Sequence, residues 1–173
     1  MKEIRWHARA GQGAKTAAQL YATAALRCGR EAQAFPEYGP ERRGAPLRAY
    51  TRVDDVPIRR HDSITHPDVA VVLEPSLLSE VDVTEGLEPG GFVLLNAERA
   101  PECLAGVDVR CVPAAKLAGD SRFVNLVLVG ALAAALGDPL EDVAAAAVDA
   151  LGTKVAPTEI RHAVEEGYGC QAR

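Results

Sequence analysis

In the first half of the chain, segments with the apolar pattern of a strand are followed by a segment with the apolar pattern of a helix and then by strand-like segments again. Residues 3–8 have a strand-like composition, and residues 12–27 place apolar side chains at helical spacing. The segment 31–46 (EAQAFPEYGPERRGAP) predicts a short strand at most, followed by a loop rich in proline, glycine and charge. Residues 47–53 (LRAYTRV) alternate strictly, which predicts a strand with one face exposed to water.

The second half of the chain is more apolar. Residues 68–75 (DVAVVLEP) are typical of a strand buried on both faces of a parallel sheet, and residues 90–98 and 107–113 predict two more strands. Two helices are predicted: 121–137 with Ser121 as the N-cap, and 138–152 between Asp138-Pro139 and Gly152. This alternation predicts an α/β fold, a single Rossmann-like domain over residues 1–173 with a mostly parallel sheet flanked by helices.

Length and charge narrow the function classes. A chain of 173 residues that is 48% hydrophobic can bury one core, and a net charge of −5 argues against a general role on nucleic acids or membrane surfaces. The apolar run 123–136 is shorter than the ~20 residues of a membrane span. The charged start MKEIRWH has no apolar signal segment, so we expect a cytoplasmic protein.

The cysteines and histidines do not have metal-ligand spacing. No C-x-x-C pair occurs, and no two histidines stand four residues apart. We therefore expect free structural thiols and no metal site on this chain. The residues concerned are Cys28, Cys103, Cys111 and Cys170, with His7, His61, His66 and His162.

The segment ARAGQG, residues 8–13, stands between the first strand and the first helix, where dinucleotide-binding proteins carry G-x-G-x-x-G. Here Ala8 and Ala10 replace the first two glycines, and the helix-packing glycine survives as Gly13. A P-loop is excluded because Ala14 separates Gly13 from the lysine. We therefore interpret this as a tight strand-to-helix turn without a nucleotide, whose free amide groups could still contact an anion.

Three segments together resemble the gamma subunit of the thiamine-diphosphate, iron–sulfur 2-oxoacid:acceptor oxidoreductases, the pyruvate:ferredoxin oxidoreductase family. They are WHARAGQGAKTAAQLYATAA (6–25), AQAFPEYGPERRGAPLRAYTRV (32–53) and PIRRHDSITHPDVAVVLEPSLL (57–78). The block FPEYGPERRGAP is the most specific part. The family usually shows G-x-G-G-Q-G in the first turn, from which this chain departs at Ala8 and Ala10.

The resemblance implies a part in the oxidative decarboxylation of a 2-oxo acid to an acyl-CoA. It implies no cofactor on this chain, with thiamine diphosphate, Mg, [4Fe-4S] clusters and coenzyme A on partner subunits. Those partners would be alpha, beta and delta type subunits, arranged as a dimer of hetero-oligomers. The work of this chain would be assembly, and the shaping of one wall of an active-site or coenzyme A channel.

Two groups of residues are candidate contacts. The turn motif is Gly11, Gln12 and Gly13, in which the Gln12 amide would either contact a neighbouring chain or cap the helix. The candidate interface or ligand-facing loop comprises Glu37, Tyr38, Glu41, Arg42, Arg43 and Gly44. There the arginines would meet carboxylates or an anion, the two glutamates could pair with them, and Tyr38 would be an anchor.

Two other functions remain open from the sequence. One is a free-standing NAD(P)-binding Rossmann enzyme with an altered glycine loop, against which the missing glycines count. The other is a small anion-binding regulatory module that uses the arginine loop. The sequence does not select the 2-oxo acid or the electron acceptor.

Overall fold

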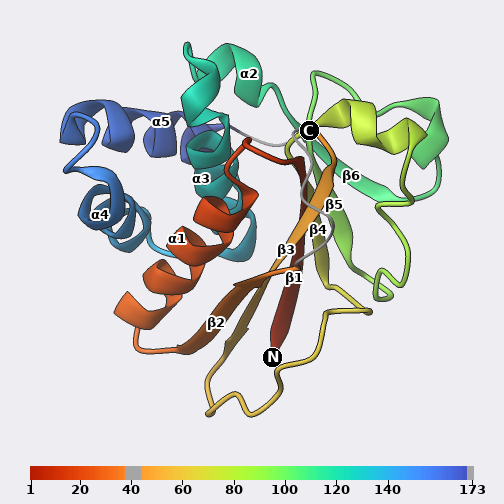
Figure 1. Cartoon of the computed structure of the whole chain (residues 1–173), viewed down its shortest axis with the longest axis horizontal. Coiled ribbons are helices and arrows are strands. Elements are labelled where there is room, and N and C mark those ends of the chain that lie inside the picture. Colours follow the sequence, from red (N-terminus) through yellow and green to blue (C-terminus); the bar gives the residue numbers. More distant parts are fainter. Residues whose placement is uncertain (38–43, 171–173) are drawn as a thin grey trace.

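A computed structural model of the chain describes residues 1–37 and 44–170, which form a six-stranded sheet with helices packed on one face (Figure 1). The strand order is β2-β3-β1-β4-β5-β6. β4, β5 and β6 continue parallel to β1, whereas β2 and β3 form an antiparallel hairpin beside it. The strands are β1 (Lys2–Arg9), β2 (Glu31–Pro36), β3 (Pro46–Asp54), β4 (Val69–Val72), β5 (Phe92–Asn96) and β6 (Asp108–Val112).

The helical layer covers one face of the sheet and encloses the larger apolar core. Alternate residues of β1, Ile4, Trp6 and Ala8, point into this core and are fully buried. The α-helices are α1 (Ala14–Arg27), α2 (Ala114–Leu117), α3 (Val124–Leu136), α4 (Leu140–Leu151) and α5 (Pro157–Gly169). α3 is buried along most of its length, as its uninterrupted apolar sequence predicts.

Two glycines allow α3 and α5 to pack with their backbones in contact. A methyl group added at Gly130 would overlap the carbonyl oxygen of Val164, and one added at Gly167 would overlap the carbonyl oxygen of Val127. Each glycine therefore fits against the backbone of the other helix. This close approach fixes the position of α5 against the centre of the core.

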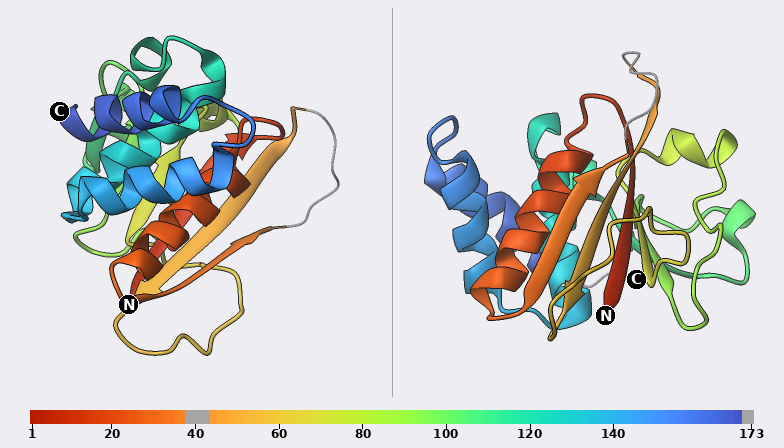
Figure 2. Two further views of the ribbon diagram at one scale, coloured as in Figure 1. Left: turned by 90° about the vertical axis from the view of Figure 1, so that its left-hand side faces the viewer. Right: turned by 60° about the horizontal axis from the view of Figure 1, so that its bottom comes forward.

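The opposite face of the sheet carries no long helix within the described part of the chain. It is covered by the connections between β4, β5 and β6, which contain the short 3-10 helices η1 (Pro75–Ser79) and η2 (Glu102–Leu104) (Figure 1). They enclose a smaller apolar cluster that includes Val72, Val93 and Leu104. The β3–β4 connection projects from the sheet at the end that holds the N-terminus (Figure 2).

The structure corrects three sequence predictions. The strand 47–53 does not have an exposed face, because Arg52 on its second face is fully buried and bonded to Glu3 at 2.6 Å. Ser121 is not an N-cap: Asp120 accepts the capping bond from the Arg122 amide, and α3 itself begins at Val124. The helix predicted over 138–152 begins at Leu140 with Pro139 as its N-cap, and the Asp138 carboxylate bonds instead to Tyr21 and to Arg30.

Candidate functional site

The candidate site lies at the carboxyl end of β1, where the chain order of the sheet changes direction. From β1 the chain passes through α1 to the β2–β3 hairpin on one side, and it then returns to β4 on the other side of β1. Open α/β sheets bind ligands at such a point, outside the carboxyl ends of the strands. The turn after β1, the start of β3 and the segment after β4 all meet here.

The turn itself is built for packing. Gly11 and Gly13 have φ values of +98° and +82°, a region that side chains other than glycine rarely adopt. A methyl group at Gly13 would lie 2.7 Å from Nδ2 of Asn125 on α3. Ala8 points into the helical core, and the Ala10 amide donates to the carbonyl of Ala45 at 3.0 Å. Of the two alanines that depart from the family pattern, Ala8 thus packs in the core and Ala10 bonds to the segment before β3.

Gln12 bonds within the chain through both ends of its amide group. Its Oε1 accepts from the backbone N–H of Arg9 at 2.7 Å, and its Nε2 donates to Oε2 of Glu74 at 2.7 Å. Glu74 in turn caps η1 by accepting from the Ser76 amide. Burial acts to raise the pKa of Glu74, but these hydrogen bonds outweigh it and lower that pKa. Gln12 therefore ties the first turn to the end of β4 and does not cap α1.

Arg9 is the centre of the site, although no sequence pattern points to it. Its guanidinium bonds to Oε1 of Glu80 at 2.5 Å, to Oγ of Ser76 at 2.9 Å and to the carbonyl of Gly44 at 3.0 Å. The Arg9 hydrogen bond lowers the pKa of Glu80. One side chain therefore joins β1 to the segment after β4 and to Gly44, two residues before β3.

The candidate loop is described only at its two ends. Glu37 accepts a hydrogen bond from the Tyr50 hydroxyl, and its amide donates to the carbonyl of Arg48 at 3.0 Å. Burial and then the Glu37 bond raise the pKa of Tyr50 to about 12. Gly44 has a φ of +80° and accepts from Arg9. Tyr38, Glu41, Arg42 and Arg43 lie outside the described residues.

Below this edge, a buried polar pair lies on the second face of β1. Arg5 donates from Nε to Nε2 of His7 at 3.0 Å, and from Nη2 to the carbonyls of Val83 and Glu85 at 3.1 and 2.6 Å. Burial, and then the charge of Arg5, lower the pKa of His7 to about 3, so the imidazole is neutral at pH 7. Arg5 thus fastens the β4–β5 connection to the sheet.

The described residues do not fit an iron–sulfur cluster or another metal. No group of three or more His, Cys, Asp and Glu side chains is placed to hold an ion between residues 1 and 37 or 44 and 170. Cys111 is buried, Cys103 is exposed, and Cys28 and Cys170 are half-buried. Burial raises the pKa of the Cys28 and Cys111 thiols, which is the opposite of what a thiolate ligand needs.

Comparison with known proteins decides the family. The family model described as Pyruvate ferredoxin/flavodoxin oxidoreductase matches residues 3–170. The chain belongs to this family. The resemblance inferred from the sequence is therefore confirmed, and the match extends well beyond residue 78, where the strongest resemblance ended.

Two relatives of this chain carry the gamma-subunit name. The "Pyruvate/ketoisovalerate oxidoreductases common subunit gamma" of Thermococcus kodakarensis is 58% identical over 59% of this chain and 55% of its own length. That of Pyrococcus abyssi is 47% identical over 79% of each chain. The chain thus spans about half the length of the first of these relatives.

Solved structures share the fold of the oxidoreductase domain. Pyruvate oxidoreductase subunit PORC from Thermotoga maritima is 35% identical, with a TM-score of 0.78 over 96% of this chain and 94% of that one. The gamma subunit of a keto/oxoacid ferredoxin oxidoreductase from Geobacter sulfurreducens, 22% identical with a TM-score of 0.73, supports the fold alone. The α/β sheet predicted from the sequence is confirmed. Within the described residues no helix is long and apolar enough to cross a membrane.

Proposed function

We propose that this chain is the non-catalytic gamma-type subunit of a thiamine-diphosphate and iron–sulfur dependent 2-oxoacid:acceptor oxidoreductase. The complex would oxidatively decarboxylate a 2-oxo acid to an acyl-CoA in the cytoplasm. The family match over residues 3–170 carries this proposal. Thiamine diphosphate, Mg, the clusters and coenzyme A belong to alpha, beta and delta type partners in it, and this chain holds none of them.

The hydrogen bonds at the carboxyl end of β1 support a structural role for the chain. Many α/β proteins bind a nucleotide at this position. Here Gln12 bonds to the Arg9 backbone and to Glu74, and the Arg9 guanidinium bonds to Glu80, so these polar groups are used in contacts within the chain. A phosphate approaching the turn would also meet Glu74, whose charge the neutral Gln12 amide does not cancel, whereas Glu80 is paired with Arg9. The Glu74 carboxylate argues against the NAD(P)-enzyme alternative, since it would repel a pyrophosphate.

The loop that begins at Glu37 and ends at Gly44 is the part we assign to the partner or to the coenzyme A channel. Its two described ends are held by Tyr50 and Arg9 at the same edge of the sheet. Such anchoring lowers the entropy that the segment loses on docking. Arg42 and Arg43 would then face carboxylates of the partner, or an anionic ligand, near the reaction centre.

Co-expression with the partner subunits encoded in the same host tests the proposal. The chain should co-purify in a fixed ratio with brown, cluster-bearing subunits, and the complex should reduce a low-potential dye when given a 2-oxo acid and coenzyme A. Replacing Arg42 and Arg43 together by alanine should weaken assembly or turnover relative to the wild type, more at low salt than at high salt, because salt already screens the wild-type contact. The circular dichroism of the chain should be unchanged. A chain that purifies from its host without partners, or binds NAD(P) at micromolar concentration, would refute the assignment.

A further inference from the structure

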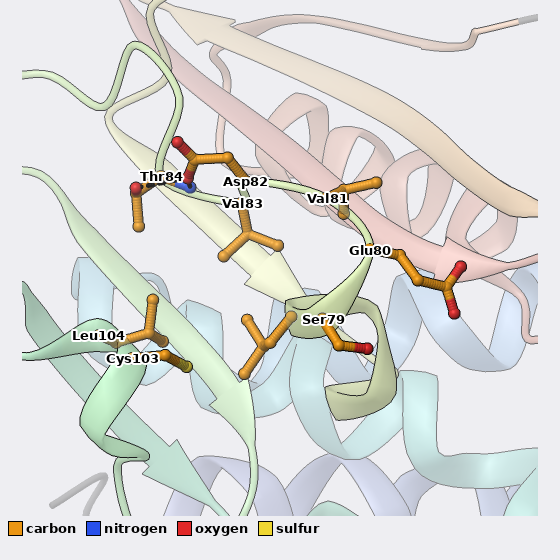
Figure 3. A pocket seen from close by; sticks show the side chains of 9 residues that line it. Ser79, Glu80, Val81, Asp82, Val83, Thr84, Cys103 and Leu104 are labelled. Atoms are coloured by element: carbon orange, nitrogen blue, oxygen red, sulfur yellow. Dashed lines mark hydrogen bonds between the residues drawn. The ribbon is translucent and has the colours of Figure 1, made fainter.

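A groove lies on the face of the sheet that the long helices leave uncovered. Two adjoining hollows, of about 460 and 430 Å³, share Leu78, Ser79 and Cys103 as walls. In Figure 3, Asp82, Val83 and Thr84 stand on one side of the first hollow, and Cys103 and Leu104 stand on the other. The groove therefore runs between the segment after β4 and the η2 turn.

The two halves of the groove differ in chemistry. The second hollow is lined mainly by apolar groups, among them Leu78, Leu95 and Pro101, with Arg99 at its margin. The first hollow carries Glu80 and Asp82 along one wall. Hydrogen bonds from Thr84 lower the pKa of Asp82, and because these donors are neutral the carboxylate keeps its full negative charge at pH 7.

Ion pairing decides which of these carboxylates carries net charge into the groove. Residues 61–98 contain no lysine or arginine, and they supply the wall of the first hollow that faces η2. Five of their eight carboxylates are paired with bases elsewhere in the chain, and Glu80 is one of them, paired with Arg9. Asp82 is the carboxylate of the groove for which the described residues show no ion pair. A negative charge beside an apolar floor favours a basic and apolar partner over a phosphate-bearing ligand.

We propose that this groove is a docking site for a segment of a partner subunit in which an apolar side chain stands beside a lysine or arginine. The apolar side chain would enter the hollow lined by Leu78 and Leu95, at the end where Arg99 stands. The cation would lie against Asp82 at the other end. The inference rests on the proposed function, since it identifies the face that the partner covers.

The wall of the groove is held in place before a partner arrives. Arg9 fixes Glu80 and Ser76, Arg5 fixes the carbonyls of Val83 and Glu85, and Ser79 donates to the carbonyl of Ser76 at 2.9 Å. A preformed surface loses little conformational entropy on binding. This favours a docking site over a surface that is exposed by chance.

Thiol labelling gives a direct test, because Cys103 is exposed in the groove. We expect N-ethylmaleimide to modify Cys103 in the isolated full chain and to modify it at least ten-fold more slowly in the purified complex. A Thr153→Cys variant places a control thiol at an exposed position on the helical side, where the labelling rate should change little. Equal rates at Cys103 in the two samples, or equal protection at both positions, would overturn the proposal.

Binding measurements test the chemistry of the occupant. Ser79→Trp should fill the groove and prevent assembly, and Asp82→Lys should raise the dissociation constant of the partner about 3-fold or more, since exposed charge pairs contribute modestly. Asp55→Lys is the matched control, because Asp55 is exposed beyond the opposite end of β3. Wild-type affinity of both groove variants would refute the docking site, even if the partners still co-purify as the proposed function requires. Protection of Cys103 in the concentrated isolated chain would instead indicate a second copy of this chain.

Discussion

Asp138, at the junction of α3 and α4, joins the helical layer to the hairpin side of the sheet. Its two carboxylate oxygens accept from the Tyr21 hydroxyl and from Nη2 of Arg30. Burial, and then the Asp138 bond, raise the pKa of Tyr21 far above its usual value. Asp138 is 6% exposed and Tyr21 is 1% exposed, so loss of the carboxylate would leave the buried Tyr21 hydroxyl without its acceptor.

Asp138→Ala should therefore destabilise the chain by about 2–3 kcal/mol, the range for a buried hydrogen bond to a charged group. Asp149→Ala is the matched control. Asp149 lies on α4 and pairs with Arg27 of α1, the helix that also carries Tyr21. Both side chains of this pair are exposed, so the expected loss of stability is below about 1 kcal/mol. Urea unfolding of the isolated chain measures both. Equal losses would show that Asp138 contributes no more than a surface ion pair.

His7 makes the stability depend on pH in a defined window. Its pKa is about 3 in the folded chain and about 6.5 when unfolded, so below pH 6.5 the unfolded state binds the extra proton. The free energy of unfolding should fall by up to about 1.4 kcal/mol for each pH unit between 6.5 and 3 from this residue. His7→Gln should flatten the profile between pH 6.5 and 5, whereas the exposed His162→Gln should leave it unchanged.

Glycine at position 13 allows a left-handed backbone and also leaves room for Asn125, and a comparison with Gly29 separates these two effects. Gly13→Ala would place a methyl group at φ +82° and 2.7 Å from Nδ2 of Asn125. Gly29→Ala has a similar φ of +76°, and its methyl group would meet no described atom within 4 Å. Gly29→Ala should cost about 1 kcal/mol for the left-handed backbone, and Gly13→Ala should cost more, because the Asn125 side chain must also move aside. Thermal unfolding of the two variants would contradict this if their midpoints agreed.

At the scale of elements, the sequence pattern identified most of the secondary structure. The buried run 69–72, the strands around Phe92 and Asp108 and the apolar helix α3 follow from period and composition. The α5 helix was not predicted as an element, because its sequence PTEIRHAVEEGYG is polar and ends in glycines. Gly167 has a tertiary reason, the close approach to α3, which a single sequence does not display.

The candidate site was predicted less completely than the fold. The turn glycines were recognised from their motif, but Arg9 occupies a variable position of that motif and carries no signal. Its partners Ser76 and Glu80 are almost seventy residues away, so only the sheet topology brings them together. The buried arginines Arg5 and Arg52 contradict the expectation that charges mark an exposed strand face. Loop carbonyls accept from Nη2 of Arg5, and the Glu3 carboxylate accepts from Nε of Arg52, whereas Nη1 of Arg52 has no hydrogen-bond partner among the described residues.

The α3–α5 contact gives a prediction at this scale. Gly167→Ala should destabilise the chain by about 1–3 kcal/mol, since the methyl group would force the two helix backbones apart. Gly169→Ala, two residues further along α5, would meet no described atom within 4 Å and should be neutral or slightly stabilising. Chemical denaturation followed by circular dichroism compares the pair. A neutral Gly167→Ala would mean that the helices can separate without cost.

For the whole molecule, the dispersal of the thiols predicts the properties of the isolated chain. It should be colourless and contain no stoichiometric iron, because the described cysteines do not gather into a ligand set and two of them have raised pKa values. Iron analysis and the visible spectrum after anaerobic reconstitution with iron and sulfide test this. One cluster per chain would contradict the assignment of the clusters to partner subunits.

The unequal covering of the two sheet faces divides the molecule into regions of different local stability. The helices and one face of the sheet enclose most of the apolar core, whereas the turns on the other face cover a cluster of six buried residues. Segments with few buried contacts open without global unfolding. Amide hydrogens in residues 75–91 and 97–107 should therefore exchange with solvent deuterium well before those of α3. When a partner covers that face, the same amides should gain protection first, so exchange rates would report assembly from within this chain.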